Sequence, residues 1–275
     1  MEKAVPDIPE IRRPPGPVVA WVENVGLWLT GGMETAGHTV SLLAETIYWL
    51  KALWVKRDEV ASKIAYTGFG SLPVVLMISF FTGLILALQT GIELTRYNQE
   101  STIGALVAAI MFREMGPVMT GIILAALVGS SYAAELGTMS VSEEVDALRV
   151  MSISPVKFLV MPRVVALAIT APILTLFSDL VGIAGGAVIG NAMLHVDFAV
   201  YYDWVQWAVN ISDIFKGLLK AFLFGVIIAV VGCSQGLRAT RGAEGVGFAT
   251  MRSVVISFVM IMIGDYLVNW FVYSG

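Results

Sequence analysis

Five long apolar stretches limit the folds open to this chain more than any other feature of its sequence. They cover roughly residues 68–92, 101–131, 158–192, 213–237 and 248–273. Each reaches the length of about 20 residues that an α-helix needs to cross the hydrocarbon core of a bilayer. Because lipid offers no partner for free backbone groups, such stretches cross membranes as helices. The sequence therefore predicts an all-α membrane protein with five transmembrane helices.

The composition agrees with this fold class. Of the 275 residues, 57% are hydrophobic and 14% are charged, whereas the charged share of soluble domains is about 25%. The single cysteine, Cys233, lies inside the fourth apolar stretch, which excludes a disulfide framework within the chain and most zinc motifs. We expect no metal site.

The region before the first apolar stretch divides into two parts. Residues 1–17 are rich in proline and charge and lack the apolar segment of a cleavable signal, so we expect a disordered cytosolic N-terminus. Residues 18–67 mix tryptophan and tyrosine with charged side chains, which is typical of a helix lying in the membrane interface. We expect an amphipathic helical elbow there, followed by a five-helix domain over 68–275.

The basic residues predict the orientation of the helices. With the N-terminus inside, thirteen of the seventeen Lys and Arg residues fall on the cytosolic side, as the positive-inside rule requires. The segment 193–212 has no Lys or Arg and is rich in aromatic residues, as expected for an aromatic belt at the outer surface. The C-terminus is therefore expected on the outer side.

A polar segment, residues 140–154, separates the second and third apolar stretches. Ser140 followed by Glu143 predicts a capping box at the start of a short helix, and Pro155 predicts its end. Its charged residues are Glu143, Glu144, Asp146 and Arg149, and its apolar ones are Val141, Val145, Leu148 and Met151. Two interpretations are open: a solvated loop helix, or a docking helix that passes motion between the membrane part and a cytosolic partner.

Charged residues also occur within the predicted spans. Arg113 and Glu114 lie in the second, Lys220 in the fourth and Asp265 in the fifth. A charge at membrane depth costs roughly 2.5–3.5 kcal/mol on insertion scales, so these side chains should face a cavity or a partner. The helical rise places all of them in the outer half of the bilayer, whereas Asp179 of the third span lies nearer mid-depth.

Two interpretations of these buried charges are open. They can pair as salt bridges that determine helix packing. Alternatively, they can line a partly wet pocket for a charged amphiphile, with Lys220 and Arg113 binding a phosphate while Glu114 and Asp265 orient the two cations.

Several motifs resemble those of one family in the same order. They are REMGPV at 113–118, AELGTM at 134–139, EEVDAL at 143–148, the Pro162-Arg163 pair, GLLKAFLFG at 217–225 and GAEGVG at 242–247 followed by Asp265. Together they resemble the MlaE (YrbE-type) permease subunit of the ABC transporters that work with MCE proteins in phospholipid traffic. The resemblance covers about residues 56–273, so 68–275 is expected to be an MlaE-type permease domain.

The resemblance implies an architecture and a set of partners. It implies an interfacial N-terminal helix, five membrane helices and a short cytosolic coupling helix between the second and third. The implied partners are a second copy in a homodimer, ATPase subunits that carry ATP and Mg²⁺, an MCE-domain hexamer, a small STAS-type cytosolic subunit and phospholipid, with no nucleic acid. The implied location is the bacterial inner membrane, with a periplasmic C-terminus and a role in outer-membrane lipid asymmetry.

The resemblance also implies roles for individual residues. The substrate pocket would hold Arg113, Glu114, Lys220 and Asp265. The ATPase-coupling helix would use Glu143, Glu144, Val145, Asp146, Leu148 and Met151. This chain departs from the family at Leu127, where the motif AGRVGS usually has an arginine.

Other classes of function fit the residues less well. No G-x-x-x-x-G-K-[ST] loop is present to bind ATP, so we expect no cofactor on this chain and hydrolysis on another. An intramembrane enzyme would need a nucleophile with a base or a metal cluster, and the spans show neither motif, so no catalytic residue is expected. A secondary transporter or channel for an amphiphilic substrate is the alternative, but it would predict internal repeats.

Overall fold

The structure, a computed structural model, describes the backbone of residues 17–273. Side chains are described from residue 30 onward, except at positions 31, 32, 52, 55, 272 and 273. Of the N-terminal segment expected to be disordered, residues 1–17, all but Pro17 lie outside this range. Within residues 17–273 every regular element is a helix and no β-strand occurs, so the all-α prediction is confirmed.

Five helical segments in the described range are long and apolar enough to cross a membrane. They are Arg57–Arg96, Glu100–Val141, Val156–Leu194, Ile211–Leu237 and Gly242–Phe271. The predicted number of spans is therefore confirmed. The helices are longer than the apolar stretches because backbone hydrogen bonding continues into the polar residues that flank each stretch.

Three of the five spans are single α-helices, and two consist of several helical elements. The first, fourth and fifth spans are α2 (Arg57–Arg96), α9 (Ile211–Leu237) and α10 (Gly242–Tyr273). The second consists of η2 (Glu100–Thr102), α3 (Ile103–Ile110), η3 (Met111–Met115), α4 (Gly116–Leu124), η4 (Ala125–Gly129) and α5 (Ser130–Val141). The third consists of η5 (Val156–Val160) and α7 (Met161–Leu194), and α7 continues through Pro172.

Shorter elements lie between and before the spans. α6 (Glu144–Val150) connects the second span to the third, and α8 (Phe198–Ala208) connects the third to the fourth. The chain divides into two compact units, one ending at Ser41 and one beginning at Leu42. The helix α1 (Pro17–Trp49), followed by the 3-10 turn η1 (Leu50–Val55), contains this boundary. The segment 18–67 is thus helical except at Lys56, while its place in the membrane interface stays a prediction.

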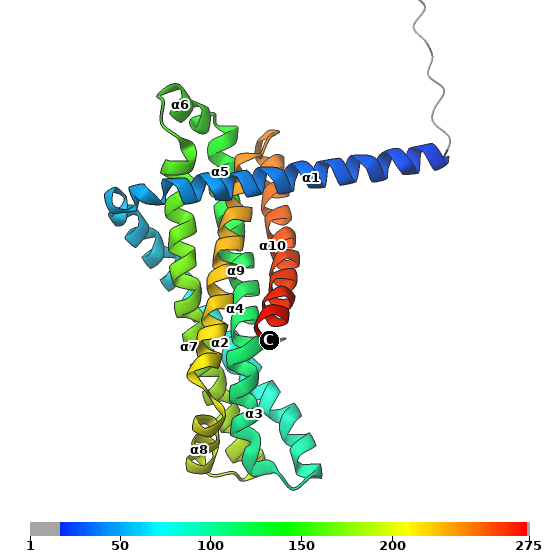
Figure 1. Ribbon diagram of the computed structural model, residues 1–275, viewed down its shortest axis with the longest axis vertical. Coiled ribbons are helices and arrows are strands. Elements are labelled where there is room, and N and C mark those ends of the chain that lie inside the picture. The colour runs from blue at the N-terminus through cyan, green and yellow to red at the C-terminus, as the bar shows by residue number, and fades with distance from the viewer. Residues whose placement is uncertain (1–16, 274–275) are drawn as a thin grey trace, which may run out of the picture. The chain divides into compact units, whose positions relative to one another are not determined.

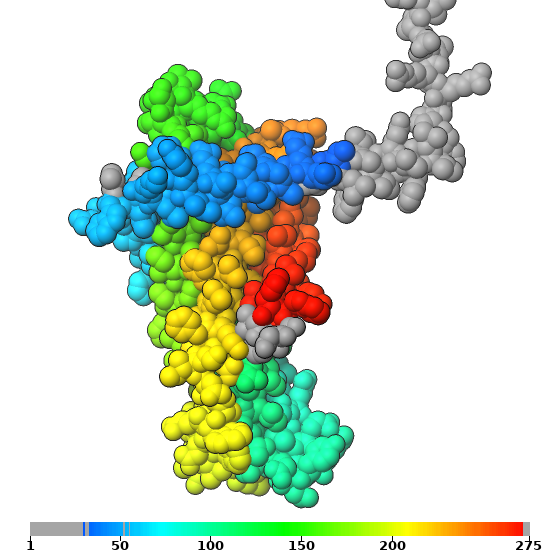
Figure 2. Space-filling model, viewed as in Figure 1, coloured from blue at the N-terminus to red at the C-terminus, as the bar shows by residue number. Residues whose placement is uncertain are grey.

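Within the second unit, α2, α4, α7, α9 and α10 run along one another, with α6 at one end of the bundle and α8 at the other (Figure 1). α10 is exposed along much of its length, and Figure 2 shows it in orange and red on the surface of this unit. Its exposed apolar residues include Phe248, Met251, Val255, Val259, Met262, Tyr266 and Trp270. Because α10 is a predicted span, this face meets lipid or another chain.

Small residues bring α2 and α7 into close contact. From Thr67 onward the buried positions of α2 recur every fourth residue and are Thr67, Ser71, Val75, Ser79, Gly83, Ala87 and Gly91. The hydroxyls of Ser79 and Ser178 are 2.6 Å apart. A Cβ atom at Gly83 would collide with the backbone of Gly182 on α7. Small side chains at such spacing let helix backbones approach each other in membranes.

Candidate functional site

The charged residues predicted in the spans do meet in the structure. Lys220 on α9 is fully buried. Its ammonium group lies 3.0 Å from Glu114 Oε1, 2.9 Å from Asp265 Oδ1 and 2.9 Å from the backbone oxygen of Arg113. Two of its N–H groups donate to Glu114 and to the Arg113 carbonyl. The contact with Asp265 is an ion pair without a hydrogen bond, because Asp265 Oδ1 has no hydrogen-bond partner among the described residues. Lys220 therefore joins the second, fourth and fifth spans.

Local backbone geometry explains why the Arg113 carbonyl is available to Lys220. Pro117 follows four residues later, and proline has no N–H to donate to that carbonyl. Residues 111–115 form the π-helical turn η3, and such turns occur frequently at functional sites. The wide turn carries both Arg113 and Glu114. The motif REMGPV thus determines a local irregularity as well as two charges.

Arg113 pairs with a carboxylate other than Glu114 and Asp265, the two that were expected to orient it. Its guanidinium group donates to Asp213 Oδ2 at 2.9 Å, and its side chain is 41% exposed. Asp213 lies in the first turn of α9, seven residues before Lys220, so both face the same side of that helix. Asp213 was not among the predicted site residues, although its seven-residue spacing from Lys220 is visible in the sequence.

Two interpretations of the buried charges were open, a set of salt bridges or a pocket for a charged ligand, and the contacts favour a different one for different residues. Lys220 behaves as a buried salt-bridge residue, because its donors are directed at protein atoms. Arg113 and Glu114, whose side chains are 41% and 36% exposed, remain accessible to a ligand. The cluster of Arg113, Glu114, Asp213, Lys220 and Asp265, here called the span cluster, contains two cations and three carboxylates.

A second charged cluster lies toward the α6 end of the bundle. Glu135 on α5 accepts from Lys63 on α2 at 3.1 Å and from Arg163 on α7 at 2.8 Å, both through Oε2. Arg163 also donates to the backbone oxygen of Leu159 at 2.7 Å. We call these three charged residues the inner cluster. The motifs AELGTM and Pro162-Arg163 contain two of its members, but sequence reasoning assigned no role to them.

Asp179 is not part of either cluster. It is buried on α7 against Gly116, where an added Cβ atom would collide with its carboxyl group. Its Oδ1 atom has no hydrogen-bond partner among the described residues, and the same holds for the hydroxyls of Thr120 and Thr175. Asp179 therefore brings a carboxyl oxygen without a hydrogen-bond partner to the contact between α4 and α7.

The predicted capping box before α6 is wrong. α5 continues through Val141, so Ser140 lies inside a helix, and its hydroxyl is 3.3 and 3.4 Å from the backbone oxygens of Leu237 and Ala239. Glu143 precedes α6 in the left-handed conformation, with φ of 62°, and makes no side-chain cap. The helix therefore begins after a tight reversal of the chain.

The predicted coupling residues on α6 differ in their exposure. Glu143, Glu144, Asp146 and Met151 are exposed, whereas Val145 is 4% exposed and packs in the main core with Leu148 against it. The apolar residues of this segment are therefore divided between the core and the surface. Val150, which we had not singled out, is the most exposed apolar residue of the segment at 85%.

Leu127, which replaces the usual arginine, lies in the second π-helical turn, η4, and is partly exposed. The surface at this position is therefore apolar.

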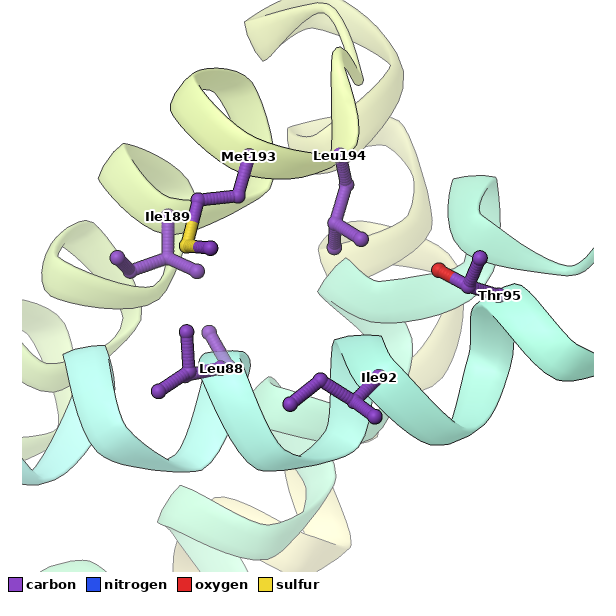
Figure 3. A pocket seen from close by; sticks show the side chains of 7 residues that line it. Leu88, Ile92, Thr95, Ile189, Met193 and Leu194 are labelled. Carbon is purple, nitrogen blue, oxygen red and sulfur yellow. The ribbon is translucent and has the colours of Figure 1, made fainter.

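An apolar cavity of about 270 Å³ lies toward the α8 end of the bundle, between α2 and α7. Figure 3 shows Leu88 and Ile92 of α2 opposite Ile189, Met193 and Leu194 of α7. No charged residue lines it, and none of the four residues predicted to bind substrate takes part. Its lining is apolar apart from Thr95.

The five apolar helices define a multi-pass membrane protein, and comparison with known proteins assigns it to the ABC transporter permease class. The profile of the family described as "Permease MlaE" matches residues 60–271. The chain belongs to this family, and the resemblance found in the sequence is confirmed.

Individual relatives agree with this assignment. A probable ABC transporter permease protein of Rickettsia typhi is 42% identical over 207 residues, which are 75% of this chain and 80% of the relative. A probable ABC transporter permease protein of Synechocystis is 37% identical over 80% of this chain and 84% of its own length. The Arabidopsis thaliana protein trigalactosyldiacylglycerol 1, chloroplastic, is 37% identical over 87% of this chain and 67% of its own length.

Proposed function

We propose that this chain is the transmembrane permease subunit of an ABC transporter that moves phospholipids between the bacterial inner membrane and an MCE protein on its outer face. The transport would maintain the lipid asymmetry of the outer membrane. The proposal draws on the family assignment and on the name of the Arabidopsis relative, which is that of a glycolipid.

The observation that carries the proposal is the unequal exposure within the span cluster. Lys220 is enclosed by Glu114 and Asp265, while Arg113 lies beside it with a partly exposed side chain. A guanidinium group binds phosphate with two parallel hydrogen bonds, which suits the phosphate of a lipid headgroup. Glu114 is accessible on the same turn and would bind the amine of a zwitterionic headgroup. In this proposal Arg113 and Glu114 contact the substrate, and Lys220 and Asp265 position them.

The remaining components follow from this role. An ABC permease requires an ATPase partner, and we propose that this partner holds ATP and Mg²⁺ and docks on α6 at the cytosolic side. We further propose that the chain forms a homodimer, that an MCE-domain hexamer binds at the α8 end, and that a small STAS-type subunit joins on the cytosolic side. The exposed apolar face of α10 is available for contact with the second copy.

The proposal is tested by purification of the tagged chain in mild detergent from its native host, followed by mass spectrometry of proteins and lipids. We expect an ATPase, an MCE protein and phospholipid to copurify. Arg113→Gln should then reduce the phospholipid bound per complex, while Arg96→Gln, which removes an exposed charge from the end of α2, should not. A complex with neither ATPase nor phospholipid would contradict the proposal and favour a secondary transporter or channel.

A further inference from the structure

We infer that the inner cluster of Lys63, Glu135 and Arg163 positions the α6 segment against the membrane helices, so that movement of α6 becomes movement of the spans. This inference rests on the proposed function, because it assigns the transmission step between ATP hydrolysis and lipid movement to named residues. The three side chains are positioning residues and do not contact substrate or ATP.

The first argument is the place of the Glu135–Arg163 ion pair in the chain. Glu135 lies on α5, shortly before the chain leaves the bundle toward α6. Arg163 lies in the first turn of α7, directly after the chain returns through η5. The ion pair of 2.8 Å between them therefore closes the base of the loop that carries α6. A displacement of α6 acts on both ends of this loop, and hence on this pair.

The second argument is the connection of the pair to other helices. Lys63 joins the same carboxylate oxygen from α2. The Arg163 guanidinium also holds the Leu159 carbonyl of η5 and lies 5.8 Å from the ring of Tyr132, whose hydroxyl is 3.1 Å from that of Thr67 on α2. The cluster thus links α5, α7 and α2 at one level of the bundle.

The third argument is that the end of α5 is held separately on its other side. The Ser140 hydroxyl contacts carbonyls at the end of α9 and just beyond it. Added Cβ atoms at Gly137 and Gly236 would press on Ala239 and on the backbone of Ala133, respectively, so α5 and α9 are in close contact there. α5 therefore moves together with α9, and the inner cluster is the polar connection that extends this movement to α2 and α7.

An ionic connection suits this task better than apolar packing does. Arg163 is buried and Glu135 and Lys63 are about one-third exposed, so the charges are only partly screened by water. Two cations on different helices share one carboxylate oxygen, and small helix displacements change these distances without opening a cavity. The ion pairs can therefore form again in a second arrangement of the helices. A packed apolar core, in contrast, does not deform continuously from one arrangement to another.

The test uses the complete transporter in proteoliposomes and measures ATP hydrolysis and phospholipid transfer in parallel. In Glu135→Gln we expect the amount of lipid transferred per ATP hydrolysed to fall about tenfold, as for loss of a typical coupling between sites, while ATPase copurification is unchanged. Lys63→Gln should give a smaller fall in the same ratio, because the Glu135–Arg163 pair remains. Arg96→Gln, which opens an exposed ion pair elsewhere on α2, is the matched control and should leave the ratio as in the wild type.

The outcomes distinguish this inference from the proposed function. If the wild-type complex transfers no phospholipid, the proposed function fails. If the wild type is coupled and Glu135→Gln reduces hydrolysis and transfer in equal proportion, or changes neither, the inference is overturned and the cluster is a scaffold only. If Glu135→Gln does not assemble, Lys63→Gln decides by the same ratio, since Lys63 is partly exposed and its loss breaks one contact.

Discussion

Lys220 on α9 and Asp265 on α10 form an ion pair of 2.9 Å inside the predicted membrane region, and Glu114 completes the cluster from the second span. Each of these charges lies within 3.0 Å of a charge of opposite sign. Breaking a buried pair costs more than replacing all its members, because the remaining charges have no partner.

The first prediction follows from this arrangement. Lys220→Met should destabilise the protein by about 3–5 kcal/mol, since it leaves two carboxylates together without a cation. The triple variant Lys220→Met, Glu114→Gln, Asp265→Asn should recover most of that loss. Thermal unfolding in detergent measures both. Lys220→Glu would bring three carboxylates together, so lost transport in that variant would report misfolding. A Lys220→Met protein as stable as the wild type would contradict the structural role of this residue.

The second prediction concerns the contact between α2 and α7. Gly83→Ala should lower stability by about 1–3 kcal/mol, the usual cost of overpacking, because its Cβ atom meets the backbone of Gly182 and backbone atoms cannot rotate away. Gly70→Ala on the same helix is the control. No atom lies within 4 Å of its added Cβ, and alanine favours the helix by about 1 kcal/mol, so stability should not fall. Equal unfolding temperatures for the two variants would refute the close contact at Gly83.

The third prediction concerns ATPase docking on α6. Val150→Glu and Met151→Glu should reduce ATPase copurification without loss of the folded permease, because both side chains are exposed and charge would oppose an apolar contact. Tyr97→Glu, an exposed aromatic residue beyond the far end of α2, should leave ATPase binding unchanged. Val145 is unsuitable for this experiment because it belongs to the core. Full ATPase recovery in both α6 variants would argue against docking at this surface.

The fourth prediction concerns the anchoring of α8. The buried Tyr201 hydroxyl donates to the backbone oxygen of Ile183 at 3.1 Å. Tyr201→Phe should cost about 1 kcal/mol, as for one buried hydrogen bond, whereas Tyr202→Phe at the exposed neighbour should cost almost nothing. Chemical denaturation of both variants measures the difference.

Tyr201 should also make stability depend on pH. Burial raises the pKa of Tyr201 above its ordinary value. The unfolded chain then loses the phenol proton at about pH 10 while the folded chain keeps it, so stability falls as the pH rises above about 10. Tyr201→Phe should remove this part of the decline. An identical pH dependence in the variant and the wild type would contradict the burial of the phenol group.

Much of the fold could be predicted from local patterns. The apolar stretches determine five helices, because backbone N–H and C=O groups in lipid must form hydrogen bonds within the same segment. The motifs with Arg113, Glu114, Lys220 and Asp265 indicated which charges lie in the spans. The helical rise per residue placed these charges at similar depths in the bilayer.

Other features depend on contacts between distant parts of the chain. Whether Ser140 caps a helix or lies within one depends on how far α5 extends, and α5 is supported there by the turn that follows α9. Likewise, Asp213 rather than a residue of the predicted set pairs with Arg113, and Glu135 receives its two cations from other helices. Local patterns determine where helices form, because their backbone hydrogen bonds are local. The partner of each buried charge is determined by helix packing, because side chains far apart in the sequence meet only when the bundle has assembled.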